Sequence, residues 1–131
     1  MTLKQFEVYV QNRPGEVARI AEVLAKNSVN IRGISIDMAP SKPIIRVITD
    51  DENSAKSALK SASLEFTERE VLVVSLSDRP GELAKVTKKL ARAGINIESL
   101  FILGSKTNSE EVALGVDKLE KAQELLSKFT S

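Results

Sequence analysis

The sequence predicts an α+β protein made of two tandem β-α-β-β-α-β units, each an antiparallel sheet with its helices on one face. The first observation is an internal repeat, in which Asn12-Arg13-Pro14-Gly15-Glu16 returns 66 residues later as Asp78-Arg79-Pro80-Gly81-Glu82. The second is that residues 11–31 and 77–97, aligned without a gap, are identical at nine of 21 positions. A self-match at a fixed period indicates a repeated structural unit. We therefore predict two domains, at residues 1–68 and 69–131.

Hydrophobic periodicity predicts the elements of the first copy. Residues 4–10 alternate between apolar and polar side chains, as in a strand. A helix follows, because Val17, Ile20, Ala21 and Leu24 have the i, i+3, i+4, i+7 spacing of one buried face. The remaining expected elements are strands at 29–38 and 44–48, a helix for which residues 50–53 offer acidic and capping side chains, and a short strand at 64–66. This order is that of the ferredoxin-like fold.

The second copy repeats this order but is incomplete. We expect strands at 71–76, 95–103 and 111–116, helices at 80–93 and 118–129, and a polar turn at 104–108. A fourth strand would begin near Phe129, so the last strand of the second unit should be short or absent. Because an exposed sheet edge is a liability, we expect the first unit or another subunit to cover it. Residues 65–76 carry almost no turn signal, so the fourth strand should run nearly straight into the fifth.

The second strand of each copy has a shift in its apolar pattern. Val29 and Ile31 alternate, and the apolar set then changes phase to Ile34 and Ile36, as it does again 66 residues later. A phase change puts side chains on the wrong face of a flat strand, and a β-bulge corrects it. We predict bulges near residues 32–33 and 98–99.

Composition narrows the classes of function. Hydrophobic residues make up 42% of the chain and charged residues 28%, with a net charge of +1, no cysteine and no histidine. A nucleic-acid-binding protein normally has a basic excess, and the absence of histidine removes the usual acid–base catalyst and the commonest metal ligand. No stretch is long and apolar enough for a membrane span, and no signal peptide is evident. We expect a cytoplasmic protein with no cofactor, no metal, no nucleic-acid partner and no membrane association.

The candidate binding residues lie in two places in each copy. One is the loop before the repeated helix, which contains Gly15 or Gly81, and the other is the asparagine fifteen residues after that glycine, Asn30 or Asn96. Gly15 and Gly81 allow close approach of the backbone, and the free N–H groups of a helix N-terminus favour a carboxylate. The amides of Asn12 and Asn30 can hold an ammonium and a carboxylate together. We expect the loop and Asn30, or Asn96 in the second copy, to meet at one edge of the unit, which would suit a free amino acid.

Each of these residues also has a purely structural explanation. Asn12 and Asp78 are typical helix N-caps, and taken singly we favour that role over ligand binding. The arginine after each is expected to be solvated or salt-bridged, and the helix macrodipole accounts for Glu16 and Glu82. The joint occurrence of all these residues twice, at the same spacing, favours a binding site.

The repeated pattern of strand, Asn/Asp-Arg-Pro-Gly-Glu-Val/Leu-Ala, amphipathic helix and Val/Ile-Asn-Ile resembles the opening half of an ACT domain. The resemblance covers essentially the whole chain as two copies, similar to stand-alone double-ACT regulatory proteins. It implies a module that senses a small molecule, often an amino acid, between two domains, where the loop of one faces the second strand of the other.

The resemblance also implies which residues bind the ligand. They are the loop before each helix and the start of the strand that follows it: Asn12, Arg13, Pro14, Gly15, Glu16, Val17, Ala18, Asn30 and Ile31, and Asp78, Arg79, Pro80, Gly81, Glu82, Leu83, Ala84, Asn96 and Ile97. The histidine that some members use two residues before the loop asparagine is replaced here by Val10 and Leu76. Asp78 would repel a carboxylate, so the two sites should differ, and we expect Asn12 and Asn30 to form the better pocket.

These observations lead to one function and several alternatives. The expected function is a non-catalytic regulatory protein that binds a free amino acid at ACT domain interfaces, forms a homo-oligomer of two or more copies, and acts on an enzyme or regulator encoded elsewhere. The main alternative is an assembly module that has kept the fold and lost the ligand. A small phosphatase using Arg13 and Asn30 lacks the flanking features of such enzymes, and RNA binding lacks an aromatic platform.

Overall fold

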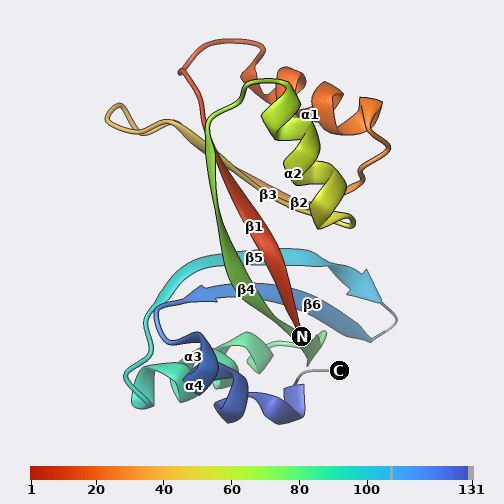
Figure 1. Ribbon diagram of the computed structural model, residues 1–131. Helices are drawn as coiled ribbons and strands as arrows, with labels where there is room; N and C mark the ends of the chain where they lie inside the picture. The colour runs from red at the N-terminus through yellow and green to blue at the C-terminus, as the bar shows by residue number, and fades with distance from the viewer. Residues whose placement is uncertain (107, 130–131) are drawn as a thin grey trace. The chain divides into compact units, whose positions relative to one another are not determined.

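A computed structural model describes residues 1–106 and 108–129 of the chain (Figure 1). The elements in chain order are β1 (Thr2–Tyr9), α1 (Glu16–Lys26), β2 (Ile31–Asp37), β3 (Ile44–Thr49), α2 (Glu52–Ser61), β4 (Phe66–Ser77), α3 (Glu82–Arg92), β5 (Ile97–Lys106), β6 (Ser109–Val116), α4 (Leu119–Leu125) and a 3₁₀ turn (Ser127–Phe129). The chain forms two compact units, one of Lys4–Arg69 and one of Met1–Leu3 with the residues from Glu70 onward. The domain boundaries expected at 68 and 69 stay a prediction.

The first unit has the expected ferredoxin-like arrangement. Its strands lie in the order β2-β3-β1-β4, and β3 is antiparallel to both β1 and β2. Helices α1 and α2 lie together on one face of this sheet (Figure 1). Ile31 of β2 and Phe66 of β4 pack against the core between the sheet and these helices, whose buried residues are Phe6, Val8, Ile20, Leu24, Val29, Ile45, Val47, Ala55, Leu59 and Leu64.

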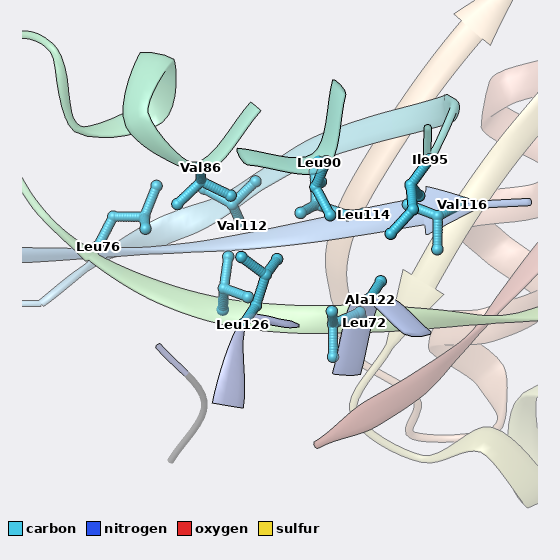
Figure 2. Packing of buried hydrophobic residues seen from close by; sticks show 11 residues of the cluster. Leu72, Leu76, Val86, Leu90, Ile95, Val112, Leu114, Val116, Ala122 and Leu126 are labelled. Atoms are coloured by element: carbon cyan, nitrogen blue, oxygen red, sulfur yellow. The ribbon is translucent and has the colours of Figure 1, made fainter. Parts of the chain in front are cut away.

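The second unit repeats this plan without a final strand among the described residues. Its strands lie in the order β4-β6-β5, both pairings are antiparallel, and α3 and α4 cover one face. Figure 2 shows the core, in which Val86 and Leu90 of α3 pack against Leu76, Val112 and Leu114 of the strands. The Val73 N–H donates to the Met1 carbonyl oxygen at 3.0 Å. Within this compact unit, the first residues of the chain therefore lie beside the outer edge of β4, where a fourth strand would be.

Both predicted β-bulges are confirmed. The register between β2 and β3 shifts between Ile31 and Gly33, and the register between β5 and β6 shifts between Ile97 and Ser99. The extra residue in each strand corrects the phase of the apolar side chains that follow. A further shift between Ile102 and Gly104 was not expected from the pattern.

Several expected boundaries differ from the structure. The expected strands at 64–66 and 71–76 form one continuous strand, β4, so the prediction of a nearly straight run is confirmed. The expected turn at 104–108 is shorter, because β5 continues to Lys106; Thr107 lies outside the described residues. The last helix ends at Leu125 rather than at 129, and the Phe129 N–H donates to the Leu126 carbonyl oxygen, as in a tightened 3₁₀ turn.

Truncation of the repeated core leucine tests the two cores separately. Leu24 and Leu90, which are equivalent in the repeat, are both fully buried. Leu24→Ala and Leu90→Ala should each lower the free energy of unfolding by about 2–5 kcal/mol, because each leaves a cavity. Urea denaturation measures this, and Lys88→Ala on the exposed face of α3 should change it by less than about 0.5 kcal/mol. Equal small effects at all three positions would contradict the described packing.

Candidate functional site

The loop between β1 and α1 turns through a glycine in a left-handed conformation. Gly15 precedes the helix with φ = 93°, and Gly81 precedes α3 with φ = 90°. A Cβ added at either glycine would meet nothing within 4 Å among the described residues. Glycine is therefore needed here for its backbone conformation, and open space remains beside it.

The expected capping role of Asn12 and Asp78 is wrong. The helices begin at Glu16 and Glu82, with glycine as the N-cap residue and no side chain of the described residues bonded as a cap. Because the left-handed glycine starts the helix, Asn12 and Asp78 lie three residues before the N-cap, too early for that role. The side chains of both residues remain exposed, and in α3 the Glu82 N–H donates to the Arg79 carbonyl oxygen at 3.4 Å.

The carboxylate of Glu16 closes the first loop. Glu16 is only 4% exposed, and its Oε1 accepts a hydrogen bond from the Gln11 N–H at 3.0 Å. Its Oε2 lies 3.7 Å from Nε of Arg13 and 3.6 Å from Nη2 of Arg19. The backbone hydrogen bond from Gln11, followed by the charges of Arg19 and Arg13, lowers the pKa of Glu16. The macrodipole therefore does not by itself account for Glu16, and hydrophobic periodicity carries no signal for its hydrogen bond to the Gln11 N–H.

The second loop has a related but different ion cluster. Oε2 of Glu82 lies 2.9 Å from Nζ of Lys85 and 3.5 Å from Nε of Arg79. The hydrogen bond from Lys85 is the main cause that lowers the pKa of Glu82. The expectation that Arg13 and Arg79 are salt-bridged is confirmed. The clusters differ mainly in that Lys85 takes the place of Arg19. The ammonium group of a lysine cannot form two parallel hydrogen bonds with a carboxylate, as a guanidinium group can.

Asn30 and Asn96 are held by aspartates that the sequence analysis missed. The Asn30 N–H donates to Oδ1 of Asp50 at 2.9 Å, and the Asp50 N–H donates back to the Asn30 carbonyl oxygen at 3.1 Å. Asn96 and Asp117 make the same reciprocal pair at 2.9 and 3.2 Å. Asp117 lies 67 residues after Asp50, so an ungapped comparison at 66 could not align them. The available signal was an aspartate directly after the third strand of each copy.

The expectation that the loop and Asn30 meet at one edge of the unit is wrong. Tyr9, at the end of β1, pairs with Ile44, whereas Ile31, at the start of β2, pairs with Thr49. These partners lie at opposite ends of β3, about 16 Å apart at the usual rise per residue. The helix carries the chain back along the sheet. The loop before α3 and Asn96 are separated in the same way in the second unit.

The other expected site residues divide between surface and core. Pro14, Ala18, Pro80 and Ala84 are exposed, and Leu83 is 37% exposed. The partly buried apolar members pack against the cores: Val17 and Ile31 in the first unit and Ile97 in the second. These three side chains have a structural role that is sufficient to explain them.

A hollow of about 340 Å³ lies beside the first loop. The end of β1 and the loop form one part of its lining, which includes Arg13, Glu16 and Arg19. The segment Ser63–Glu65, before β4, forms another part. Its volume falls within the range of small-molecule sites. Of the expected site residues, the structure brings Arg13 and Glu16 to this hollow.

The described part of the chain contains no group of three or more residues able to ligate a metal. None of the helices described is both long enough and apolar enough to cross a membrane.

Comparison with known proteins identifies the chain's relatives. A family model described as "ACT domain pair" matches residues 1–129. A crystal structure of a Bacteroides thetaiotaomicron protein is similar with a TM-score of 0.87 and 29% identity, covering 98% of this chain and 88% of that one. The regulatory subunit of aspartate kinase from Thermus thermophilus, in its ligand-free form, shares the fold with a TM-score of 0.68 and 18% identity, covering 98% and 93%. No curated protein matches the sequence.

Neutralising Glu16 should weaken the first unit in a pH-dependent way. Because its pKa is lowered in the folded state, its carboxylate contributes stability above its unfolded pKa, and this is lost as the pH falls through the lowered value. Glu16→Gln should therefore lower the melting temperature by a few degrees at neutral pH. The difference from the wild type should shrink as the pH falls from about 5 to about 3.

Glu22→Gln, on the exposed face of α1, is the matched control and should leave the melting temperature unchanged at both pH values. A loss of stability in Glu16→Gln that is the same at neutral and acidic pH would show that the carboxylate charge is not its cause.

Proposed function

Because the chain belongs to the ACT domain pair family, we propose that it is a non-catalytic regulatory protein that binds a free amino acid. The observation that carries this proposal is the first loop. An exposed Asn12 and the start of α1, which has no side-chain cap among the described residues, lie in one short segment, beside a hollow whose lining includes Arg13 and Arg19. Helix N-termini and guanidinium groups both favour a carboxylate.

The second loop supports a weaker site. The side chain of Asp78 is exposed, and its carboxylate would oppose that of an amino acid. Its cluster contains one arginine where the first loop has two. We propose that the first loop binds the amino acid more tightly. Binding would then act by favouring one packing of the domains over another.

We further propose that the protein forms a homo-oligomer through its edge strands. β2 and β5 are each the last strand in the order of their own unit. Each exposes two apolar side chains at equivalent positions: Ile34 and Ile36 on β2, and Leu100 and Ile102 on β5, from 38% to 58% exposed. Unpaired strand edges with apolar side chains favour association. A second copy of the chain would then bring its Asn30 or Asn96 to a loop, as the resemblance to ACT pairs implies.

The regulated protein is proposed to be encoded elsewhere, and the expected cytoplasmic location stays a prediction. The aspartate kinase regulatory subunits share the fold, at 18–19% identity. That likeness supports the architecture alone, so the amino acid is to be found by a binding screen.

Amino-acid binding is tested by thermal shift against the twenty standard amino acids, with calorimetry for each that shifts the transition. An amino acid that binds only the native state stabilises it by about 2.7 kcal/mol when its concentration is a hundred times Kd. This stabilisation raises the melting temperature. Asn12→Ala and Arg13→Ala should reduce the shift, whereas Asp78→Ala, which removes a carboxylate that opposes the ligand, should not reduce it. If no amino acid at millimolar concentration shifts the transition, the assembly-module alternative replaces this proposal.

The homo-oligomer is tested by sedimentation of the double variant Ile36→Lys with Ile102→Lys. Burying two added charges at an interface is unfavourable, so the variant should sediment as a smaller species than the wild type. Ala91→Lys, at an exposed position of α3, is the control and should leave the oligomer intact. A wild-type monomer, or a double variant with unchanged mass, would overturn the proposed interface.

A further inference from the structure

One side of helix α3 carries a stripe of cationic side chains. They stand at the i, i+3, i+4 and i+7 spacing of a single helix face: Lys85, Lys88, Lys89 and Arg92. At 3.6 residues per turn, this spacing places all of them within a sector of about 100°. Lys89 is half-buried, and the others are exposed. The buried residues of α3 are Val86 and Leu90, which Figure 2 shows in the core. We call the cations the α3 basic stripe.

The equivalent helix of the first unit has no such stripe. Shifted by the 66-residue repeat, Lys88 and Lys89 correspond to Glu22 and Val23 of α1. Helix α1 has two acidic and two basic side chains, whereas α3 has one acidic and four basic side chains. Both helices have the same place in the order of their units, and both pack on the core of a sheet. The fold therefore does not require the stripe.

Most of the charges of the stripe have no partner in the described part of the chain. Nζ of Lys85 lies 2.9 Å from Oε2 of Glu82. The other members of the stripe form no ion pair or side-chain hydrogen bond with a residue that the structure describes. Like charges three or four positions apart on a helix repel each other, so the stripe lowers the stability of α3. Folding alone therefore does not explain these residues.

The helix macrodipole explains only part of the stripe. Two of its members lie in the last turn of α3, where a cation is favourable. This end of the helix already has two other cations. Nζ of Lys118 donates to the Gly94 carbonyl oxygen, and Nζ of Lys121 donates to the Ala93 carbonyl oxygen, both at 2.8 Å. The remaining members of the stripe precede the last turn, where the macrodipole has little effect.

The excess of positive charge is local. Residues 70–131 contain nine basic and nine acidic side chains, so this stretch has no net charge outside the balance of its own groups. Nucleic-acid-binding proteins have a broader basic excess, because a long polyanion extends beyond a single helix. The stripe extends over about two helical turns. This length is complementary to a short acidic segment of a protein.

We propose that the α3 basic stripe is the docking surface for a short acidic segment of the protein that this chain regulates. Carboxylates of that segment would pair with the guanidinium group of Arg92 and the lysine ammonium groups. Complementary charge of this kind determines the choice and orientation of a partner. The inference rests on the proposed function in one respect, that the regulated protein is a separate chain. It does not depend on amino-acid binding.

The experiment measures binding to the full chain by fluorescence anisotropy with labelled probes. They are a peptide of alternating glutamate and alanine, a glutamine–alanine peptide of the same length, and a single-stranded DNA oligonucleotide with the net charge of the first peptide. The stripe variant is Lys88→Glu with Lys89→Glu. The control variant, Lys26→Glu with Lys60→Glu, makes the same change of net charge at exposed positions of the first unit. Circular dichroism checks that each variant is folded.

The wild type should bind the glutamate peptide and not the glutamine peptide, and its affinity should fall as the salt concentration rises. The stripe variant should bind at least about tenfold more weakly, because two attractions become repulsions. The control variant should bind like the wild type. The inference is overturned if the wild type does not bind the glutamate peptide, if both variants lose binding equally, or if the oligonucleotide binds at least as tightly as the peptide.

The stripe variant should also be at least as stable as the wild type. Each new glutamate stands three or four positions from Lys85 and from Arg92, so like-charge pairs on α3 become opposite-charge pairs. Thermal unfolding measures this, and a stripe variant that loses both binding and stability would overturn the inference. The thermal shift caused by an amino acid should be the same in the wild type and the stripe variant. Its absence from both would contradict amino-acid binding and leave the docking surface in place.

Discussion

The left-handed backbone at Gly15 and Gly81 is the constraint on which the two loops depend. A residue with a Cβ is strained in this conformation, and the glycine turns the chain into its helix without a side-chain cap. The first helical residue is then a glutamate, whose carboxylate is free to turn back to the loop. In the first unit the Glu16 carboxylate accepts a hydrogen bond from the Gln11 N–H and forms ion pairs with two arginines, Arg13 and Arg19. One backbone conformation thus accounts for the uncapped helix, the buried acid and the clustered cations.

The fold could be predicted from the sequence because its signals are local and occur twice. The repeat fixed the number of units, and the phase change at Ile34 and Leu100 was sufficient to locate both bulges, since strand periodicity is strict. The continuous strand β4 followed from the lack of turn residues before Val71.

The candidate site could be predicted only in part, because its geometry depends on contacts between distant segments. Asn12 was expected to cap its helix and does not, since the glycine takes the N-cap position. Asn30 was expected near the loop, but the register of β3 places it at the far end of the sheet. Asp50 carried no repeat signal, because its partner in the second copy, Asp117, is displaced by one residue. Such residues are recognised only once the strands are paired.

The bulges in β2 and β5 would limit the alignments in which a strand of another chain could pair with these edge strands. Each lies near the start of its strand and interrupts the ladder with the neighbouring strand. A regular stretch follows, Gly33–Asp37 in β2, before the strand ends. An incoming strand that must match this stretch has few alternative alignments, because a slip by one residue exchanges its two faces. In the proposed homo-oligomer, the bulge would therefore favour one alignment of the paired strands over alignments shifted by one residue.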